Sequence, residues 1–414
     1  MERPVSKLAL VAMAAAVLGI AGCGGSGGSS GTVSNNGGGN GNGGGNAANS
    51  QAISVNSGPT GQYVNGVFTS VTVCIPGTSN CQTISNVLVD TGSSGLRLLA
   101  SGAAGGALTL ALPQENASNG NPLVECAQFA DGFTWGPMVT ADVKMAGEVA
   151  SSVPIQVIDA STFSIPRSCS QTGPAENTLG SLLANGLLGV GVFRQDCGSG
   201  CTSPGFHVYF ACSTSSSCPE VGATLTQQAQ NPVWMFTSDN NGVVIQLPQI
   251  SASGAPSAAG TITFGIGTQS NNALGNATVL TTAADGTLST TFGNTTYSET
   301  FIDSGSNGYF FLTSGSTGIP LCPDGSGFYC PATTQNLAAT NRGANGNSSV
   351  VNFSVANEQT LFSNAANDAF NDLGGDNSPP PAFDWGLPFF FGRTVFTAIE
   401  SQNTPAGNGP YLAY

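Results

Sequence analysis

The chain has 414 residues, of which 58 are glycine and only 7% are charged, and its formal net charge is −14. Eight lysines and arginines are too few for a nucleic-acid-binding surface, and a hydrophobic fraction of 40% excludes a disordered polyelectrolyte. The length suffices for two domains, and short runs rich in threonine and valine between glycine turns predict a mostly-β protein.

The first 22 residues are typical of an export signal. Charged residues precede an apolar run at positions 8–21, which is too short for a membrane-spanning helix. The run ends in Ile20-Ala21-Gly22-Cys23, which resembles the lipobox of bacterial lipoproteins. That resemblance implies cleavage before Cys23, lipid on the Cys23 thiol and a place in the bacterial cell envelope, and the following glycine favours the outer membrane. A plain secretion signal is the alternative.

Composition divides the rest of the chain. Residues 23–55 are rich in Gly, Asn and Ser and predict a flexible tether. We expect an N-terminal lobe at 56–240 and a C-terminal lobe at 241–414. Helical patterns are scarce, and the best candidates are 176–186 and 357–373.

The ten cysteines that follow Cys23 predict disulfides, because an exported protein keeps such bonds. Five bridges are possible. Short spacing favours three local pairs: Cys74 with Cys81, Cys212 with Cys218, and Cys322 with Cys330. The remaining four cysteines have no assigned pairing from sequence: Cys126, Cys169, Cys197 and Cys201.

Two short segments carry the strongest functional signal. In NVLVDTGSSGLRLLAS (86–101) an apolar run ends at Asp90, and in SETFIDSGSNGYFFL (298–312) a similar run ends at Asp303. Burying a lone carboxylate is costly unless something uses it. Two carboxyl groups held together can share one proton, so that one member takes a proton from water while the other polarises a carbonyl. Gly92 and Gly305 would let the two loops approach closely.

The hydroxyl residues of these segments have expected supporting roles. Ser93 and Ser306 can donate hydrogen bonds to the adjacent carboxylate and fix its orientation. Thr91 and Ser304 can bond across to the opposite loop and hold the two loops together. Turn-capping aspartates are the alternative, but they would not need matched flanking strands.

Both segments resemble the catalytic motifs of the pepsin-like aspartic peptidases. Further similar segments follow in the expected order at 184–193, 259–280 and 383–400, so the resemblance covers residues 60–414. It implies a mostly-β, bilobal pepsin-like acid-protease fold, with two similar β-barrel-like lobes and a cleft between them. It also implies that Asp90 and Asp303 are the catalytic pair of an aspartic endopeptidase.

The chain departs from that family near the hairpin flap that covers the cleft. The flap is expected within 126–147, with Phe129 at the position of the family's tyrosine and Trp135 close by, both as candidate substrate contacts. Arg97 stands where the family has the tryptophan that bonds this tyrosine. Ordinary core packing is the alternative for both aromatic residues. A basic pro-segment is also missing, since no Lys or Arg lies between Cys23 and Asp90.

The sequence therefore favours an envelope-anchored, monomeric aspartic endopeptidase that hydrolyses polypeptides with an activated water and without a metal or cofactor. One alternative is a catalytically silent pepsin-like lipoprotein that binds peptide, glycan or an envelope partner in the same cleft. Another is a structural surface β-protein without a ligand. The single histidine, His207, has no catalytic signature around it, so we expect it to be structural.

Overall fold

The computed structural model describes residues 48–376 and 382–414. The predicted signal peptide, the lipidation site Cys23 and most of the predicted tether lie outside these residues. The tether prediction ends too late, because strand β1 (Ser50–Asn56) starts inside it and pairs with two neighbours. Its alternating polar and apolar residues, SQAISVN, are typical of a strand with one buried face.

The described residues are mostly β. The strands up to residue 246 are β1 (Ser50–Asn56), β2 (Gly66–Cys74), β3 (Cys81–Asp90), β4 (Ser94–Leu99), β5 (Leu123–Gln128), β6 (Phe133–Met145), β7 (Glu148–Ile158), β8 (Gly186–Val190), β9 (Tyr209–Ala211) and β10 (Gly242–Gln246). Those that follow are β11 (Ala258–Phe264), β12 (Val279–Thr281), β13 (Leu288–Phe292), β14 (Thr295–Ile302), β15 (Tyr309–Phe311), β16 (Gln335–Arg342), β17 (Ser348–Val355), β18 (Gly374–Gly375), β19 (Ala382–Trp385), β20 (Thr394–Ala398), β21 (Asn403–Thr404), β22 (Gly407–Asn408) and β23 (Tyr411–Ala413).

Helices are short. They are α1 (Arg167–Ser170), α2 (Leu179–Leu182), α3 (Ser314–Thr317) and α4 (Glu358–Phe362), with 3₁₀ turns η1 (Gly102–Ala104), η2 (Gly198–Thr202), η3 (Pro232–Met235) and η4 (Leu387–Phe390). The two predicted helical segments thus contain only single turns, α2 and α4. Within the described residues, no helix is both long and apolar enough to cross a lipid bilayer.

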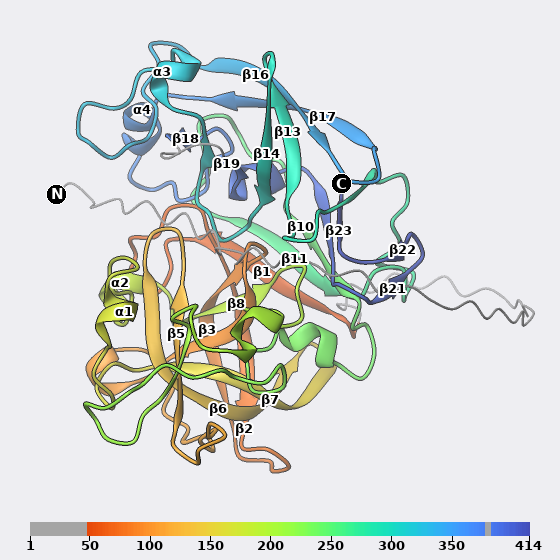
Figure 1. The fold of residues 1–414 in the computed structure, drawn as a ribbon. Coiled ribbons are helices and arrows are strands. Elements are labelled where there is room, and N and C mark those ends of the chain that lie inside the picture. The colour runs from red at the N-terminus through yellow and green to blue at the C-terminus, as the bar shows by residue number, and fades with distance from the viewer. Residues whose placement is uncertain (1–47, 377–381) are drawn as a thin grey trace, which may run out of the picture.

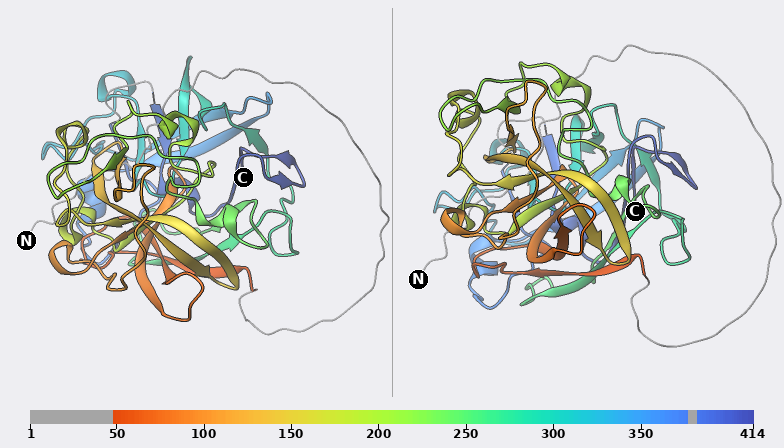
Figure 2. Two further views of the ribbon diagram at one scale, coloured as in Figure 1. Left: turned by 60° about the horizontal axis from the view of Figure 1, so that its bottom comes forward. Right: turned by 90° about the horizontal axis from the view of Figure 1, so that it is seen from below.

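The strands build a bilobal pepsin-like fold. One 14-stranded sheet runs in the order β12-β23-β20-β10-β11-β1-β2-β3-β8-β4-β7-β6-β5-β9, and a seven-stranded sheet runs in the order β17-β16-β13-β14-β19-β15-β18. In Figure 1 the red-to-green half of the chain forms one lobe, the blue-green-to-blue half forms the other, and β1, β10 and β11 lie between them. The yellow ribbons of β6 and β7 curve strongly around the N-terminal lobe (Figure 2). The predicted lobe division at residues 240 and 241 stays a prediction.

Each lobe contains the same three-strand unit. In the N-terminal lobe β8 lies between β3, which is parallel to it, and β4, which is antiparallel. In the C-terminal lobe β19 lies between the parallel β14 and the antiparallel β15. The last four residues of β3, VLVD, are all buried, as expected for a strand covered on both faces. Each unit therefore brings the end of its first strand to the junction of the lobes.

Five disulfides hold the loops of the two lobes. The three local pairs expected from spacing are present: Cys74–Cys81, Cys212–Cys218 and Cys322–Cys330. The four unassigned cysteines form Cys126–Cys169 and Cys197–Cys201. The prediction of five bridges is confirmed.

Candidate active site

Asp90 and Asp303 meet where the two lobes meet. Asp90 ends β3 opposite Gly189 of β8, and Asp303 directly follows β14 and donates its backbone N–H to the Trp385 carbonyl of β19, 3.0 Å away. Both residues are buried. Equivalent strands therefore deliver one carboxyl group from each lobe.

The two carboxyl groups are in contact. The Gly92 N–H lies 2.8 Å from Asp90 Oδ1 and 3.1 Å from Asp303 Oδ1, so one donor faces both groups. In the other loop, the Gly305 N–H donates to Asp303 Oδ1 at 2.8 Å. The pKa of each group depends on the other. Two carboxyl groups held this close can hydrogen-bond each other only when one of them carries a proton.

Each carboxyl group is oriented by the serine three residues after it. The Ser93 hydroxyl donates to Asp90 Oδ2, and the Ser306 hydroxyl donates to Asp303 Oδ2 at 2.8 Å. The Ser93 N–H adds a bond to Asp90 Oδ1 at 3.2 Å. The hydrogen bonds expected of these serines are present.

Thr91 and Ser304 join the two loops reciprocally. Thr91 Oγ1 donates to the Ile302 carbonyl at 2.9 Å and accepts from the Ser304 N–H at 2.9 Å. Ser304 Oγ donates to the Val89 carbonyl at 2.7 Å and accepts from the Thr91 N–H at 3.2 Å. All four bonds cross from one lobe to the other. They fix the separation of the carboxyl groups, as expected from the sequence.

Both glycines are required by close approach. A Cβ at position 92 would lie 2.5 Å from Asp303 Cγ, and a Cβ at position 305 would lie 2.8 Å from Asp90 Oδ1. Neither distance is compatible with a side chain. Each loop thus places bare backbone against the carboxyl group of the opposite lobe.

Burial raises the pKa of both carboxyl groups. For Asp90, hydrogen bonds from Asp303, Ser93 and the Gly92 N–H oppose this rise. For Asp303, burial and the charges of Asp90 and Asp384 together raise the pKa well above the ordinary value. The pair therefore retains a proton at a pH where free carboxyl groups have lost theirs.

Asp384 is a third buried carboxyl group beside this pair, which the sequence analysis does not identify. It lies on β19 opposite Phe301 and Phe310, and neither of its oxygens accepts a hydrogen bond from the described residues. The Ser306 hydroxyl is close enough to interact with it but donates to Asp303. Burial, and then the charge of Asp90, raise the pKa of Asp384 well above its ordinary value. In the sequence, the only sign of this site is an aspartate within the otherwise apolar strand segment AFDW.

The hairpin expected to form a flap is present. Strands β5 and β6 pair with Gln128 opposite Phe133, and Phe129 opens the turn between them, where its N–H donates to the Gly132 carbonyl at 2.8 Å. The Phe129 ring lies in an apolar cluster with residues that include Tyr63 and Leu88. Its role toward substrate stays a prediction.

Trp135 requires a correction. Its ring is fully buried, packs 5.3 Å from the Phe210 ring and donates its indole N–H to the Phe163 carbonyl at 2.9 Å. It belongs to a cluster that also contains the Cys126–Cys169 disulfide. A ring with no exposed surface cannot contact substrate, so the core-packing alternative describes Trp135.

Further acidic groups lie at the turn of the hairpin. A Cβ at Gly132 would lie 3.0 Å from Glu176 Cδ, which places Glu176 beside the turn residue Asp131. Burial, with a contribution from the charge of Asp90, raises the pKa of Asp131 to about 7. Buried Tyr63 has a hydroxyl without a partner among the described residues, and its pKa is raised by burial and by Asp131, Glu176 and both dyad residues. The charges of the dyad therefore act on the turn and on Tyr63.

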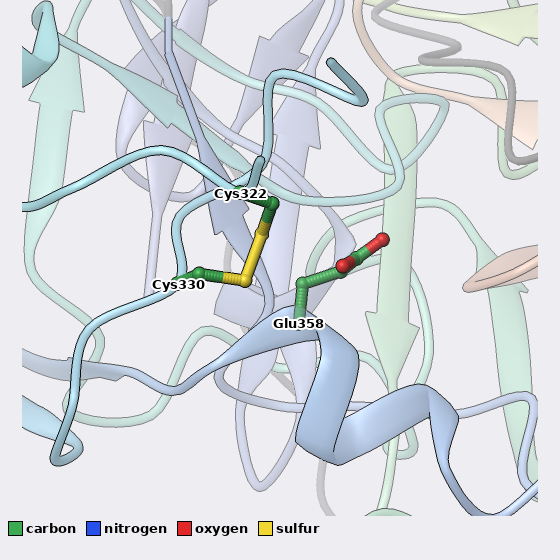
Figure 3. Close-up of side chains that lie close together, drawn as sticks. All are labelled: Cys322, Cys330 and Glu358. Carbon is green, nitrogen blue, oxygen red and sulfur yellow. A yellow bond between two sulfur atoms is a disulfide. The ribbon is translucent and has the colours of Figure 1, made fainter. Parts of the chain in front are cut away.

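Other sites are remote from this chemistry. The atoms of Cys322, Cys330 and Glu358 lie within 4.8 Å of one another (Figure 3), but the sulfurs are bonded to each other and offer no thiolate to a metal. His207 is half-exposed and pairs with Glu220 at 2.8 Å. A concave region of about 760 Å³ on the C-terminal lobe is lined by Asn336, Asn352 and Arg393 among others, and by none of the predicted site residues.

Matched Asp-Thr/Ser-Gly-Ser loops on equivalent strands of two β lobes define a bilobal pepsin-like protein with a paired-carboxyl site. The chain belongs to the family described as "Protein of unknown function (DUF3443)", which matches residues 45–414. Its structure is similar to that of an aspartic proteinase from Irpex lacteus, with a TM-score of 0.46 and 14% sequence identity over 88% of this chain and 96% of that chain. No curated protein matches the chain.

Proposed function

We propose that the protein is an aspartic endopeptidase whose catalytic pair is Asp90 and Asp303. The observation that supports this most directly is that one donor, the Gly92 N–H, reaches both carboxyl groups, at 2.8 Å and 3.1 Å, while reciprocal bonds of Thr91 and Ser304 hold the two loops together. Turn-capping aspartates would need neither the contact nor the crossed bonds. A shared proton on a pre-organised pair is what general acid–base hydrolysis of an amide requires.

The proposed reaction uses one water and no covalent intermediate. The ionised member of the pair accepts a proton from the water as the water oxygen attacks the peptide carbonyl carbon. The protonated member donates to the carbonyl oxygen, which gives a neutral tetrahedral diol. When the C–N bond breaks, a proton passes to the leaving nitrogen and the products are a carboxylic acid and an amine. The pair ends with one proton, as it began.

We further propose that this peptidase acts as a monomer anchored through a lipid on Cys23 in the bacterial envelope, at the outer membrane. The lipobox-like tetrad before Cys23 motivates the anchor. The five disulfides are consistent with an oxidising compartment outside the cytoplasm. The glycine-rich segment that follows Cys23 would act as the tether.

The test is cleavage of an unfolded protein mixture by the purified mature protein, from acid to neutral pH. We expect activity at acid pH, inhibition by a statine-type inhibitor, and loss of at least about 10³-fold in Asp90→Asn and in Asp303→Asn. Circular dichroism of the variants checks that folding survives. Cleavage that persists in both variants contradicts the proposal.

The silent-binder function has one observation in its favour. Phe129 stands at the position of the family's flap tyrosine and has no hydroxyl to donate to a substrate or water. If the protein binds the statine-type inhibitor or peptides through the dyad but cleaves none at any acid pH, this second function replaces the first.

A further inference from the structure

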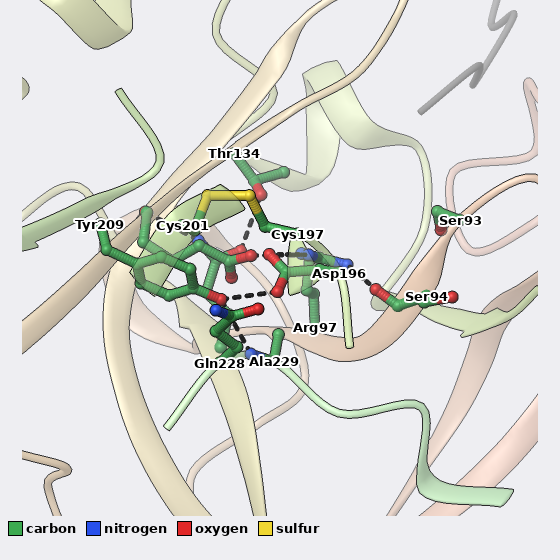
Figure 4. Close-up of polar contacts among 12 residues, drawn as sticks. Ser93, Ser94, Arg97, Thr134, Asp196, Cys197, Cys201, Tyr209, Gln228 and Ala229 are labelled. Atoms are coloured by element: carbon green, nitrogen blue, oxygen red, sulfur yellow. Dashed lines mark hydrogen bonds and ion pairs between the residues drawn. A yellow bond between two sulfur atoms is a disulfide. The ribbon is translucent and has the colours of Figure 1, made fainter. Parts of the chain in front are cut away.

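Arg97 is the centre of a buried ion-pair network in the N-terminal lobe. It lies on β4, the strand that leaves the Asp90 loop, and only 2% of its surface is exposed. Its Nη2 donates to Glu125 Oε1 at 2.6 Å and reaches Asp196 Oδ2 at 3.4 Å, and its Nη1 donates to the Ser94 carbonyl at 3.1 Å. Figure 4 shows the Arg97, Asp196 and Ser94 contacts. A cation removed from water needs partners of this kind.

Two of the contacts of Arg97 are with the β5 side of the hairpin. Glu125 is in the middle of β5, and Phe129 directly follows the strand. The guanidinium carbon lies 5.6 Å from the centre of the Phe129 ring, within the range of a cation–π interaction. Arg97 therefore contacts the hairpin once through charge and once through the face of an aromatic ring.

The far side of the network is also fixed. Asp196 accepts a hydrogen bond from the Tyr209 hydroxyl at 2.7 Å, and Tyr209 on β9 pairs with Glu125 on β5. Cys197, next to Asp196, is bonded to Cys201. Contacts from β4 and β9 thus hold the hairpin strand on this side, although Arg97 Nε and Glu125 Oε2 are buried without a hydrogen-bond partner among the described residues.

The network also reaches the catalytic loop. The carbonyl that receives the Arg97 Nη1 bond belongs to Ser94, the residue after Ser93, which orients Asp90. At the other end, Phe129 of the hairpin turn packs in the same apolar cluster as Leu88 of β3, the strand that ends at Asp90. Arg97 thus connects the loop that holds one dyad carboxyl group to a hairpin whose turn packs near the strand of that carboxyl group.

We propose that Arg97 is a positioning residue that fixes the β5–β6 hairpin relative to the Asp90–Asp303 pair and thereby sets how tightly peptide substrate is held. This inference rests on the proposed peptidase function. Arg97 touches neither dyad carboxyl group, so its loss acts on substrate binding before it acts on chemistry.

The variants separate positioning from folding. Arg97→Met leaves Glu125 without its cation and can fail to fold, so Arg97→Met/Glu125→Gln and the milder Glu125→Gln accompany it. Arg97→Lys keeps the charge but not the forked guanidinium, and we expect it to restore part of the function. Arg393→Met is the matched control, because Arg393 makes a similar contact, 4.6 Å from the Phe389 ring, in the other lobe.

The first measurement is amide hydrogen exchange by mass spectrometry. In the Arg97→Met/Glu125→Gln variant we expect peptides from 123–139 to exchange about a hundredfold faster, with no change in peptides from 288–302. Arg393→Met should leave 123–139 unchanged. Unchanged exchange in 123–139, or equal acceleration in both lobes, overturns the inference.

The second measurement is the split between KM and kcat for a peptide substrate. We expect KM to rise about tenfold in the double variant and kcat to change by less than that. The pH at which activity declines should stay close to that of the wild type. A fall in kcat alone, with unchanged KM, contradicts a positioning role through the hairpin. If the wild-type protein does not cleave, the proposed function fails by itself. Hydrogen exchange, with binding of a statine-type inhibitor in place of KM, still decides the role of Arg97.

Discussion

Replacing Gly92 by alanine tests the dyad without changing either carboxyl group. The added Cβ would lie 2.5 Å from Asp303 Cγ and within 2.8 Å of both Asp303 oxygens. Ordinary contact begins near 3.4 Å, so the Asp303 carboxyl group has to retreat by about 1 Å. The 3.1 Å bond from the Gly92 N–H to Asp303 Oδ1 then lengthens beyond hydrogen-bonding range.

A displacement of about 1 Å in a catalytic group lowers the rate by about 10²-fold, which corresponds to roughly 2.7 kcal/mol of transition-state stabilisation. The backbone of Gly92 is not in the left-handed conformation that only glycine adopts easily, so the cost to folding is that of overpacking one buried contact, about 1–3 kcal/mol. We therefore expect Gly92→Ala to fold with a lower melting temperature and to lose at least about 10²-fold in kcat.

The assay is peptide cleavage at acid pH, with binding of a statine-type inhibitor as a second readout. Gly180→Ala is the matched control, because its Cβ would meet only Thr178 Oγ1, at 4.0 Å, on the exposed helix α2. We expect full activity in the control. If Gly92→Ala keeps activity within about threefold of wild type, the close approach of the loops has no catalytic importance and the reasoning is wrong.

Three further predictions concern charge, pH and anchoring. Replacing Asp384 by Asn removes a charge that raises the pKa of Asp303, so the pH–activity profile should end at a more acid pH; an unchanged profile would separate Asp384 from the dyad. Burial raises the pKa of Asp131 from 3.8 to about 7 and of Asp372 from 3.8 to about 6, so the folded chain binds these protons more tightly than the unfolded chain. The melting temperature should therefore be highest below about pH 4 and fall as pH rises toward 7, and a rise over that range would contradict the assigned shifts. Mass spectrometry of membrane-extracted protein should find a lipidated Cys23 at the mature N-terminus, whereas a soluble form cut elsewhere would exclude the anchor.

The sequence predicts that the two carboxyl groups lie together, because the information for this is local and repeated. Asp90 and Asp303 each end an apolar run and begin the same type of turn, so two independent segments point to one arrangement. The crossed bonds of Thr91 and Ser304 follow from the same four-residue pattern. Short spacing likewise identifies Cys322–Cys330, whereas Cys126–Cys169 closes a separation of 43 residues that no local pattern encodes.

The sequence could not predict contacts between distant segments. From the sequence, Arg97 is notable only because it stands where the pepsin-like family has a tryptophan. Its partners Glu125 and Asp196 lie 28 and 99 residues away, so no local pattern reveals the ion pairs. Asp384 appears only as one polar residue in an apolar strand, since the side of β19 that faces the dyad depends on pairing with β14 and β15. The sequence likewise left open whether Trp135 contacts substrate or packs in the core. The residue pattern of β6 does not show which segments of the chain cover each face of that strand.

The protein buries carboxyl groups in two different ways, and the difference fits the chemistry of each place. Glu125 and Asp196 are buried against the guanidinium of Arg97, which remains charged at all relevant pH values. Burial and the charge of Glu125 still raise the pKa of Asp196 well above its ordinary value, so the 2.6 Å ion pair of Arg97 with Glu125 is the main connection. Asp90 and Asp303 are buried against each other, so their mutual contact depends on a proton that can move. A cation at the dyad would favour ionisation of both carboxyl groups and would remove the proton that the proposed reaction transfers. The fixed positive charge of Arg97 therefore stabilises the hairpin, at a distance from the proton that Asp90 and Asp303 share at the junction of the lobes.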